Sequence, residues 1–209
     1  MELLKSIIIL PNHIYILPHM EHKMKVRKRI IMTAGEVART IRRIASEIVE
    51  ESRGSKDLAI IGIQTRGVYI AKRIAVEIEK LEKREIPFGV LDITLYRDDV
   101  SSIANQPAVK ETKIPFSMDN KKIILVDDVL FAGRTVRAAL DELIDFGRPC
   151  VIRLAVLVDR GLRELPIQPD FVGKRTPTTR SESVHVYLKE MDDYDRVVIE
   201  ARKPGEKIK

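Results

Sequence analysis

The stretch IILVDDVLFAGRT, residues 123–135, decides the fold. An apolar run of strand length ends at two adjacent carboxylates, Asp127 and Asp128, and the chain then turns through Gly133 into a helix-like pattern. A glycine at such a turn lets several backbone amides point at one group, and the start of a helix favours anions. The turn is therefore predicted to hold a phosphate group.

The two carboxylates need a partner that is not itself anionic. Asp127 and Asp128 can accept hydrogen bonds from the neighbouring hydroxyls of a neutral diol, while Arg134 and Thr135 suit a phosphomonoester. Ribose 5-phosphate satisfies both requirements. A second anionic group on the ligand would bring magnesium with it, because this hard cation recruits oxygen ligands, often through water.

Other interpretations of this stretch fit less well. A Walker loop needs a longer glycine spacing and a lysine before Ser or Thr, which the stretch lacks. A response-regulator receiver has its paired acids near its own start, whereas here they lie well past the middle of the chain. Taken alone, two acids and a glycine are more typical of a plain solvated strand end.

Strand-like and helix-like segments alternate around the stretch. This alternation predicts an α/β fold with a central parallel sheet flanked by helices, in which ligands bind at the carboxyl ends of the strands. Residues 96–113 have no apolar period and are long enough to be a lid or binding loop. The expected helices are 34–53, 68–83 and 134–146, and the expected strands are 58–63, 88–95, 122–126, 151–158, 184–188 and 197–199.

The chain is expected to form one domain. Its bounds are predicted at about 29–200, with a small hood subdomain at about 159–190 that caps the rim of the sheet. A leader of uncertain status, residues 1–28, precedes the domain, and a basic tail, 201–209, follows it. The leader is apolar but interrupted by Pro11 and Pro18, and it lacks a small-residue cleavage pattern, so a secretory signal is not expected. Whether it is translated is left open.

Composition narrows the class of partner. Lys and Arg number 37 against 31 Asp and Glu, which gives a net charge of +6 and suits anionic partners such as phosphates or RNA. No apolar stretch approaches the ~20 residues of a membrane span. The lone Cys150 excludes an internal disulfide, which favours a reducing compartment and a cytoplasmic location. It lies in an apolar run and is predicted to be a buried small hydrophobe.

Several long motifs, in the same order, resemble the type I phosphoribosyltransferases, and in particular the members that pair uracil phosphoribosyl transfer with regulation of a pyrimidine operon. The resemblance covers about residues 28–200 and implies the type I fold with its hood. It rests on Thr65-Arg66-Gly67, DITLYRDD (92–99), VDDVLFAGRTVRAAL (126–140), LAVLVDRG (154–161), RELPI (163–167) and VGK (172–174).

The resemblance implies an enzyme that converts uracil and phosphoribosyl pyrophosphate to UMP and pyrophosphate. Magnesium would be held through the substrate and water, with no direct protein ligand. Asp127, Asp128 and Arg97 would be the catalytic residues, since the two carboxylates favour an oxocarbenium-like transition state and the arginine helps pyrophosphate leave. Val158 and Asp159 would face the base. The donor and UMP would be bound by Thr65, Arg66, Gly67, Arg97, Asp98, Asp99, Asp127, Asp128, Val129, Leu130, Phe131, Ala132, Gly133, Arg134 and Thr135.

The family's phosphate loop usually has a threonine hydroxyl where this chain has Ala132. Losing one hydrogen bond to a charged group costs about 1.5 to 3 kcal/mol. The sequence therefore predicts weaker binding of the donor than in a typical relative.

The resemblance also implies binding of the pyrimidine operon mRNA leader, favoured by UMP and opposed by the donor, so that transcription is attenuated when pyrimidines are plentiful. Ser46, Leu162 and Gln168 depart from the family at this surface. A nucleotide sensor with little activity, or an enzyme without RNA regulation, is therefore the alternative. A homo-oligomer, a dimer or higher, is expected, and no DNA or membrane partner. The expected RNA contacts are Arg39, Arg42, Arg43, Thr65, Arg163 and Lys174.

Overall fold

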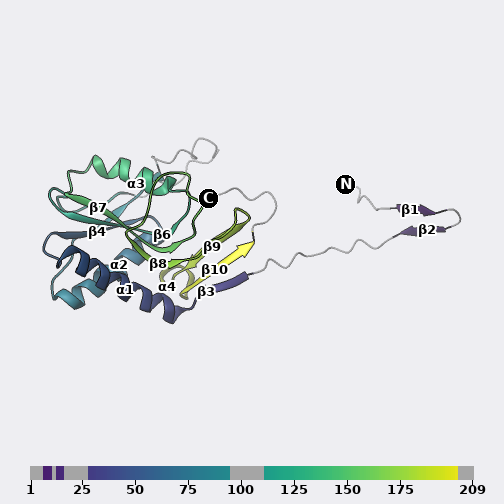
Figure 1. Cartoon of the computed structure of the whole chain (residues 1–209), viewed down its shortest axis with the longest axis horizontal. Helices are drawn as coiled ribbons and strands as arrows, with labels where there is room; N and C mark the ends of the chain where they lie inside the picture. Colours follow the sequence, from purple (N-terminus) through teal and green to yellow (C-terminus); the bar gives the residue numbers. More distant parts are fainter. Residues whose placement is uncertain (1–6, 11–12, 17–27, 95–110, 202–209) are drawn as a thin grey trace.

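The computed structural model describes residues 7–10, 13–16, 28–94 and 111–201. A five-stranded parallel sheet forms the centre of the domain, in the order β5-β4-β6-β7-β8. Helices cover both of its faces, as predicted (Figure 1). The strands are β4 (Leu58–Ile63), β5 (Phe88–Leu91), β6 (Lys122–Leu130), β7 (Val151–Asp159) and β8 (Phe171–Arg175).

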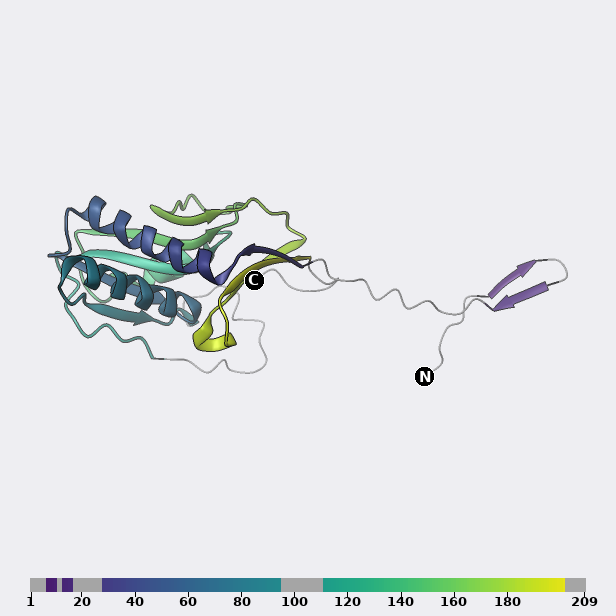
Figure 2. The same cartoon turned by 90° about the horizontal axis from the view of Figure 1, so that it is seen from below.

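The helices divide between the two faces of this sheet. Helices α1 (Ala34–Ser52) and α2 (Arg66–Glu82) lie side by side on one face, and α3 (Arg134–Ile144) lies on the other (Figures 1 and 2). Strand β4 is buried at all six positions because both of its faces are covered. Ile60 packs toward α1 and α2, and Ile61 toward α3.

A second sheet adjoins one end of the domain. It consists of β3 (Lys28–Met32), β10 (Arg196–Ala201) and β9 (Glu182–Tyr187), paired antiparallel in that order. The short helix α4 (Lys189–Asp192) connects β9 toward β10. Strand β8 lies within the stretch expected as a hood, yet it is the edge strand of the central sheet. Further toward the N-terminus, β1 (Ile7–Leu10) and β2 (His13–Ile16) pair as an antiparallel hairpin.

The predicted helices are confirmed with small shifts at their ends. Helix α1 begins after Thr33, whose hydroxyl accepts from the amide of Glu36 while the Glu36 carboxylate accepts from the amide of Thr33. It ends at Arg53 in the left-handed conformation. Helix α2 begins two residues earlier than predicted, at Arg66, and α3 ends two residues earlier, at Ile144.

Some local predictions were wrong. Strand β5 ends at Leu91, short of the predicted end at residue 95. Strand β6 continues to Leu130 instead of ending at Val126, because Asp127, Val129 and Leu130 pair with β7. Cys150 is exposed, not buried. It precedes the first residue of β7, where its amide and thiol approach the carbonyl of Lys121.

The strand order places a topological switch point between β4 and β6. From β4 the chain crosses through α2 to β5 on one side, and from β6 it crosses through α3 to β7 on the other. In open α/β sheets ligands bind in the crevice outside the carboxyl ends of the strands at such a point. The segments that follow β4 and end β6 carry residues that were predicted from the sequence to bind the ligand.

Candidate functional site

The loop after β4 and the end of β6 lie against each other through Gly67. A Cβ built on Gly67 would lie 2.6 Å from the carbonyl oxygen of Val126 and 3.2 Å from the Cα of Asp127. No side chain fits there, so α2 can begin directly beside the paired carboxylates. Thr65, Arg66 and Gly67 are therefore brought together with Asp127 and Asp128. The peptide bond between Gln64 and Thr65 is cis.

Each aspartate carboxylate accepts a hydrogen bond from the backbone amide that follows it. The amide of Asp128 donates to Oδ1 of Asp127 at 2.9 Å, and the amide of Val129 donates to Oδ1 of Asp128 at 2.9 Å. Burial raises the pKa of the Asp128 carboxyl, and hydrogen bonds with Asp127 and Val129 and the charge of Arg66 oppose that rise. A nearby cation therefore stabilises the ionised form of the Asp128 carboxyl.

Arg66 interacts with two carboxylates. Its Nη2 donates to Oδ1 and Oδ2 of Asp192 on α4, at 3.1 and 3.2 Å, and its charge also acts on Asp128. The Nε atom of Arg66 is buried and has no hydrogen-bond partner among the described residues. Buried donors are normally satisfied, so this nitrogen is suited to an anionic ligand.

The glycine turn has the shape expected of a phosphate seat. Gly133 is left-handed, with φ of 95°, and directly precedes α3. Because Gly133 has no side chain to cap the helix, it leaves the first-turn amides of α3 without a side-chain acceptor from the N-cap, as in anion sites. The carbonyl of Ala132 accepts from the amides of Glu164 and Leu165, at 3.0 and 3.1 Å. The exposed Arg134 donates to Glu164 at 2.9 Å.

The two residues expected to face the base, Val158 and Asp159, have different surroundings. Val158 is fully buried, and its backbone pairs with Val129 and Lys174, so its side chain belongs to the core. Asp159 is 9% exposed, and its Oδ1 accepts from Nη2 of Arg163 at 2.6 Å and from the amide of Gly161 at 3.0 Å.

Arg160 was not selected from the sequence. It is only 3% exposed, and its guanidinium carbon lies 4.4 Å from the ring centroid of Phe131 in the predicted phosphate loop. It also donates to the carbonyls of Thr179 and Glu182. Arg160 therefore connects the predicted phosphate loop to the start of β9 and the residues before it. The available signal in the sequence was an arginine directly after Asp159, the acid that follows the predicted strand 151–158. Its burial is seen only in the structure, where the bonds described above satisfy its charge.

The residues expected to contact RNA differ in how their side chains are used. Arg163 donates to the carbonyls of Phe131 and Ile167 as well as to Asp159, and Lys174 donates to the carbonyl of Ile31. Arg43 donates to Glu47 and to the carbonyls of Val172 and Gly173. Three of the predicted contacts thus make bonds within the protein. Arg39 and Arg42 are exposed on α1.

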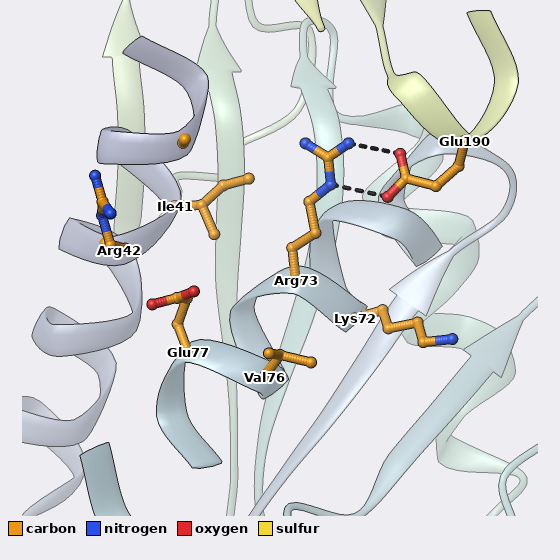
Figure 3. A pocket seen from close by; sticks show the side chains of 8 residues that line it. Ile41, Arg42, Lys72, Arg73, Val76, Glu77 and Glu190 are labelled. Carbon is orange, nitrogen blue, oxygen red and sulfur yellow. Dashed lines mark hydrogen bonds and ion pairs between the residues drawn. The ribbon is translucent and has the colours of Figure 1, made fainter. Parts of the chain in front are cut away.

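A pocket of about 310 Å³ lies between α1 and α2 (Figure 3). Arg42 lines it on the α1 side and Lys72 on the α2 side, with Ile41 and Val76 between them. Arg73 and Glu190 close one end through an ion pair of 2.6 Å. This pocket is separate from the acid pair and the glycine turn, none of whose residues line it.

Arg97, Asp98 and Asp99, which are the predicted lid residues, lie outside the described part of the chain. In the described residues, no group of three or more His, Cys, Asp or Glu side chains could hold a metal ion. Nor does any described helix have the length and apolarity to cross a membrane.

Fold and site together define the class of protein. The family model of the phosphoribosyl transferase domain matches residues 30–190, so the chain belongs to the phosphoribosyltransferases. Solved structures share the fold. A hypoxanthine phosphoribosyltransferase from Staphylococcus aureus has a TM-score of 0.61 at 18% identity, over 84% of this chain and 93% of that one. One from Trypanosoma cruzi has a TM-score of 0.65 at 15% identity, over 86% and 94%.

Curated relatives narrow the family. The bifunctional protein PyrR of Deinococcus deserti is 57% identical over 174 residues, which is 83% of this chain and 95% of that protein. The bifunctional protein PyrR of Thermus thermophilus is 59% identical over 170 residues, 81% and 94% of the two chains. The chain is thus a phosphoribosyltransferase of the bifunctional PyrR family, as the motifs indicated.

Proposed function

We propose that this protein transfers the phosphoribosyl group of phosphoribosyl pyrophosphate to uracil, and that it also binds a pyrimidine operon mRNA leader in a UMP-dependent manner. The main supporting observation is that Gly67 packs closely against β6. This contact brings Arg66, at the start of α2, near Asp127 and Asp128. One side of the crevice thus has a guanidinium for pyrophosphate, and the other has carboxylates for the ribose hydroxyls, beside the seat at Gly133.

The proposed reaction divides the work among these groups. The amides before α3, with Thr135, hold the 5-phosphate, and Asp127 and Asp128 accept hydrogen bonds from the ribose hydroxyls. As the bond to pyrophosphate breaks, positive charge develops on the ribose, and these carboxylates stabilise it. Arg66, and Arg97 from outside the described residues, neutralise the leaving pyrophosphate. Uracil supplies the nitrogen that forms the new bond, and the proton of that nitrogen leaves to solvent.

Magnesium is proposed as the cofactor, held through oxygen atoms of the donor and through water. The carboxylates of Asp127 and Asp128 are hard oxygen donors, which suit contact with magnesium through water. Two carboxylates are too few to coordinate the ion fully, and the described residues contain no group of three or more possible ligands. When bound, the ion neutralises negative charge on pyrophosphate.

One turnover assay tests the enzymatic proposal. The protein is incubated with phosphoribosyl pyrophosphate, magnesium and uracil, and UMP and pyrophosphate are measured together. The proposal expects equal amounts of both products, and neither without uracil. Hypoxanthine replaces uracil in a parallel reaction, because the solved neighbours are hypoxanthine enzymes. A preference for hypoxanthine, or no UMP at all, would contradict the proposal.

The regulatory role is supported by the exposed Arg39 and Arg42 on α1. Filter binding of a pyrimidine leader transcript, with and without UMP, tests it. A specific site should bind more tightly with UMP and lose affinity steeply with salt. An affinity that ignores UMP would leave an enzyme without this regulation.

The protein is further proposed to act in the cytoplasm as a dimer or larger homo-oligomer. Ile144 ends α3 and Phe146 lies two residues beyond it; they are 68% and 44% exposed, which offers apolar surface to a second copy. Light scattering after size-exclusion chromatography measures the assembly, and a monomer at micromolar concentration would contradict this proposal.

A further inference from the structure

Helix α2 presents two arginines to the segment around α4. Arg66 and Arg73 are seven residues apart, close to two helical turns, so they lie on one face of α2. Arg66 binds Asp192, and Arg73 binds Glu190 and Asp195. Three carboxylates of one short segment therefore hold two arginines of the helix that begins at the crevice.

Asp192 is itself fixed by the backbone around it. Its Oδ2 accepts from the amide of Leu188 at 2.9 Å, and its own amide donates to the carbonyl of Leu188 at 2.7 Å. The ion pairs of Arg73 with Glu190 and Asp195 connect the same segment to α2 a second time. Asp195 is in turn held by the amide of Lys189, which donates to it at 2.8 Å. The carboxylate that meets Arg66 thus has a fixed place.

Among the described residues, Asp192 is the hydrogen-bond partner of the Arg66 guanidinium. Its Nη2 contacts both oxygens of Asp192, while its buried Nε makes no hydrogen bond with the described residues. An arginine has five N–H donors in a rigid plane, so fixing one nitrogen fixes the direction of the others. The first turn of α2 lies against Val126 and Asp127, and the charge of Arg66 acts on Asp128, so the guanidinium lies near the acid pair.

We propose that Asp192 is a positioning residue that holds the Arg66 guanidinium in place for the pyrophosphate group of the donor. Asp192 does not itself touch the substrate. The inference rests on the proposed function, because it assigns pyrophosphate to Arg66. Through this contact the segment between β9 and β10 takes part in building the crevice, although it is more than 50 residues further along the chain than the acid pair.

Three variants separate a positioning role of Asp192 from a general loss of the contact between α4 and α2. Asp192→Asn keeps an oxygen for the Leu188 amide but removes the charge that meets Arg66. Glu190→Gln is the matched control, because it removes a carboxylate of the same short helix that pairs with Arg73 of α2 (Figure 3). Glu190 makes its hydrogen bonds with Arg73, whereas Arg66 bonds to Asp192. Asp192→Glu restores the charge on a side chain that is one carbon longer.

Steady-state kinetics and pyrophosphate binding by calorimetry are measured for each protein. For Asp192→Asn, the KM for phosphoribosyl pyrophosphate and the Kd for pyrophosphate should rise about tenfold, the effect of one charge-assisted hydrogen bond. The KM for uracil should change less than twofold. Glu190→Gln should stay within twofold on every measure, and Asp192→Glu should recover part of the loss.

The result that overturns the inference is an Asp192→Asn protein whose donor KM and pyrophosphate Kd match those of Glu190→Gln. Equal rises in the KM for uracil and for the donor would also overturn it, because they would indicate a general disturbance of the site. If Asp192→Asn does not fold, Asp192→Glu decides by its donor KM, expected between twofold and tenfold above wild type. Failure of the wild type to make UMP would refute the proposed function, and the pyrophosphate Kd would still test Asp192.

Discussion

Gly67 of α2 lies so close to the carbonyl oxygen of Val126 in β6 that a Cβ on this glycine would be 2.6 Å from it. Backbone meets backbone here, so no side chain can move aside to make room. The contact fixes the distance between the start of α2, with Arg66, and the end of β6, with its two aspartates. Much of the geometry of the crevice follows from this one missing side chain.

Gly67→Ala should therefore damage both stability and activity. Overpacking of this kind costs about 1 to 3 kcal/mol, and a shift of α2 would displace Arg66 from the acid pair. We expect thermal unfolding several degrees lower and kcat/KM reduced about a hundredfold. Gly35→Ala is the control, because the nearest atom to its new Cβ is the flexible end of Arg39 at 3.4 Å. Equal activity of the two variants would refute this account of the crevice.

The Asp128 carboxyl should make the ligand-free protein less stable as pH rises through its folded-state pKa. Because burial raises the pKa of its carboxyl in the folded state, the folded state favours the protonated form. The stability that Asp128 contributes is present below its unfolded pKa of about 3.9 and is lost as pH rises through the folded pKa. Asp128→Asn should therefore raise the melting temperature at pH 7 relative to wild type, with a smaller gain at pH 4.

The same substitution should lower turnover by more than a hundredfold, since a neutral amide cannot stabilise a cationic ribose. In wild type, kcat/KM should fall on acidification with an apparent pKa above the ordinary aspartate value. Melting curves and pH profiles on one set of samples check both statements. A variant that is less stable than wild type at pH 7 would contradict the assigned direction of the pKa shift.

Ala132→Thr should strengthen binding of the donor. A restored hydroxyl would add one hydrogen bond to a phosphate oxygen, worth about 1.5 to 3 kcal/mol, so the KM for the donor should fall about ten- to a hundredfold. Ala132 is only 7% exposed, so Ala132→Ser is made beside it as the smaller addition. If neither variant lowers the donor KM, the interpretation of the loop is wrong.

The sequence alone predicted the features that depend on neighbouring residues in the chain. The apolar run at 123–126 and Gly133 predicted a strand and a turn, and the switch point then followed from the strand–helix alternation. The pairing of Asp127 with Val156 was missed, because the end of a buried strand depends on its neighbour and not on its own polarity. Cys150 was misplaced for a similar reason, since its apolar neighbours begin a strand that it does not join.

Contacts between charged residues that are far apart in the chain could not be predicted from the sequence. Arg66 and Asp192 are separated by more than a hundred positions, and no local pattern pairs them. Arg163 and Lys174 look like free cations in the sequence, yet they donate to backbone carbonyls. Whether a charged side chain faces solvent or protein is decided by which segments fold beside it.

Asp195→Asn should destabilise the protein more than Glu190→Gln does. Both side chains bind Arg73, but Asp195 is 17% exposed against 36% for Glu190, and it also accepts from the amide of Lys189. We expect about 1 to 2 kcal/mol for Asp195→Asn and less than half of that for Glu190→Gln in urea unfolding at pH 7. The reverse order would contradict the assignment of Asp195 as the stronger partner.

The Asp195 contribution should also disappear in acid. Burial alone would raise the pKa of this carboxyl, but hydrogen bonds from Arg73 and Lys189 outweigh it and lower the pKa. A lowered pKa means stability that is present above the unfolded value near 4 and lost as pH falls through the folded one. Wild type and Asp195→Asn should therefore converge in stability below about pH 3. A gap that persists there would indicate that packing, not charge, produces the difference.

Arg42→Gln should weaken binding of the leader transcript while leaving UMP synthesis unchanged. Arg42 is exposed on α1, and a cation that neutralises one phosphate contributes about one unit to the slope of log affinity against log salt. We expect filter binding to show a several-fold loss of affinity and a slope that is smaller by about one. Arg137→Gln removes an equally charged, exposed side chain from α3 on the opposite face of the sheet and serves as the control. An equal loss with both variants would mean that RNA responds only to the net charge of the protein, and would refute a specific RNA surface on α1.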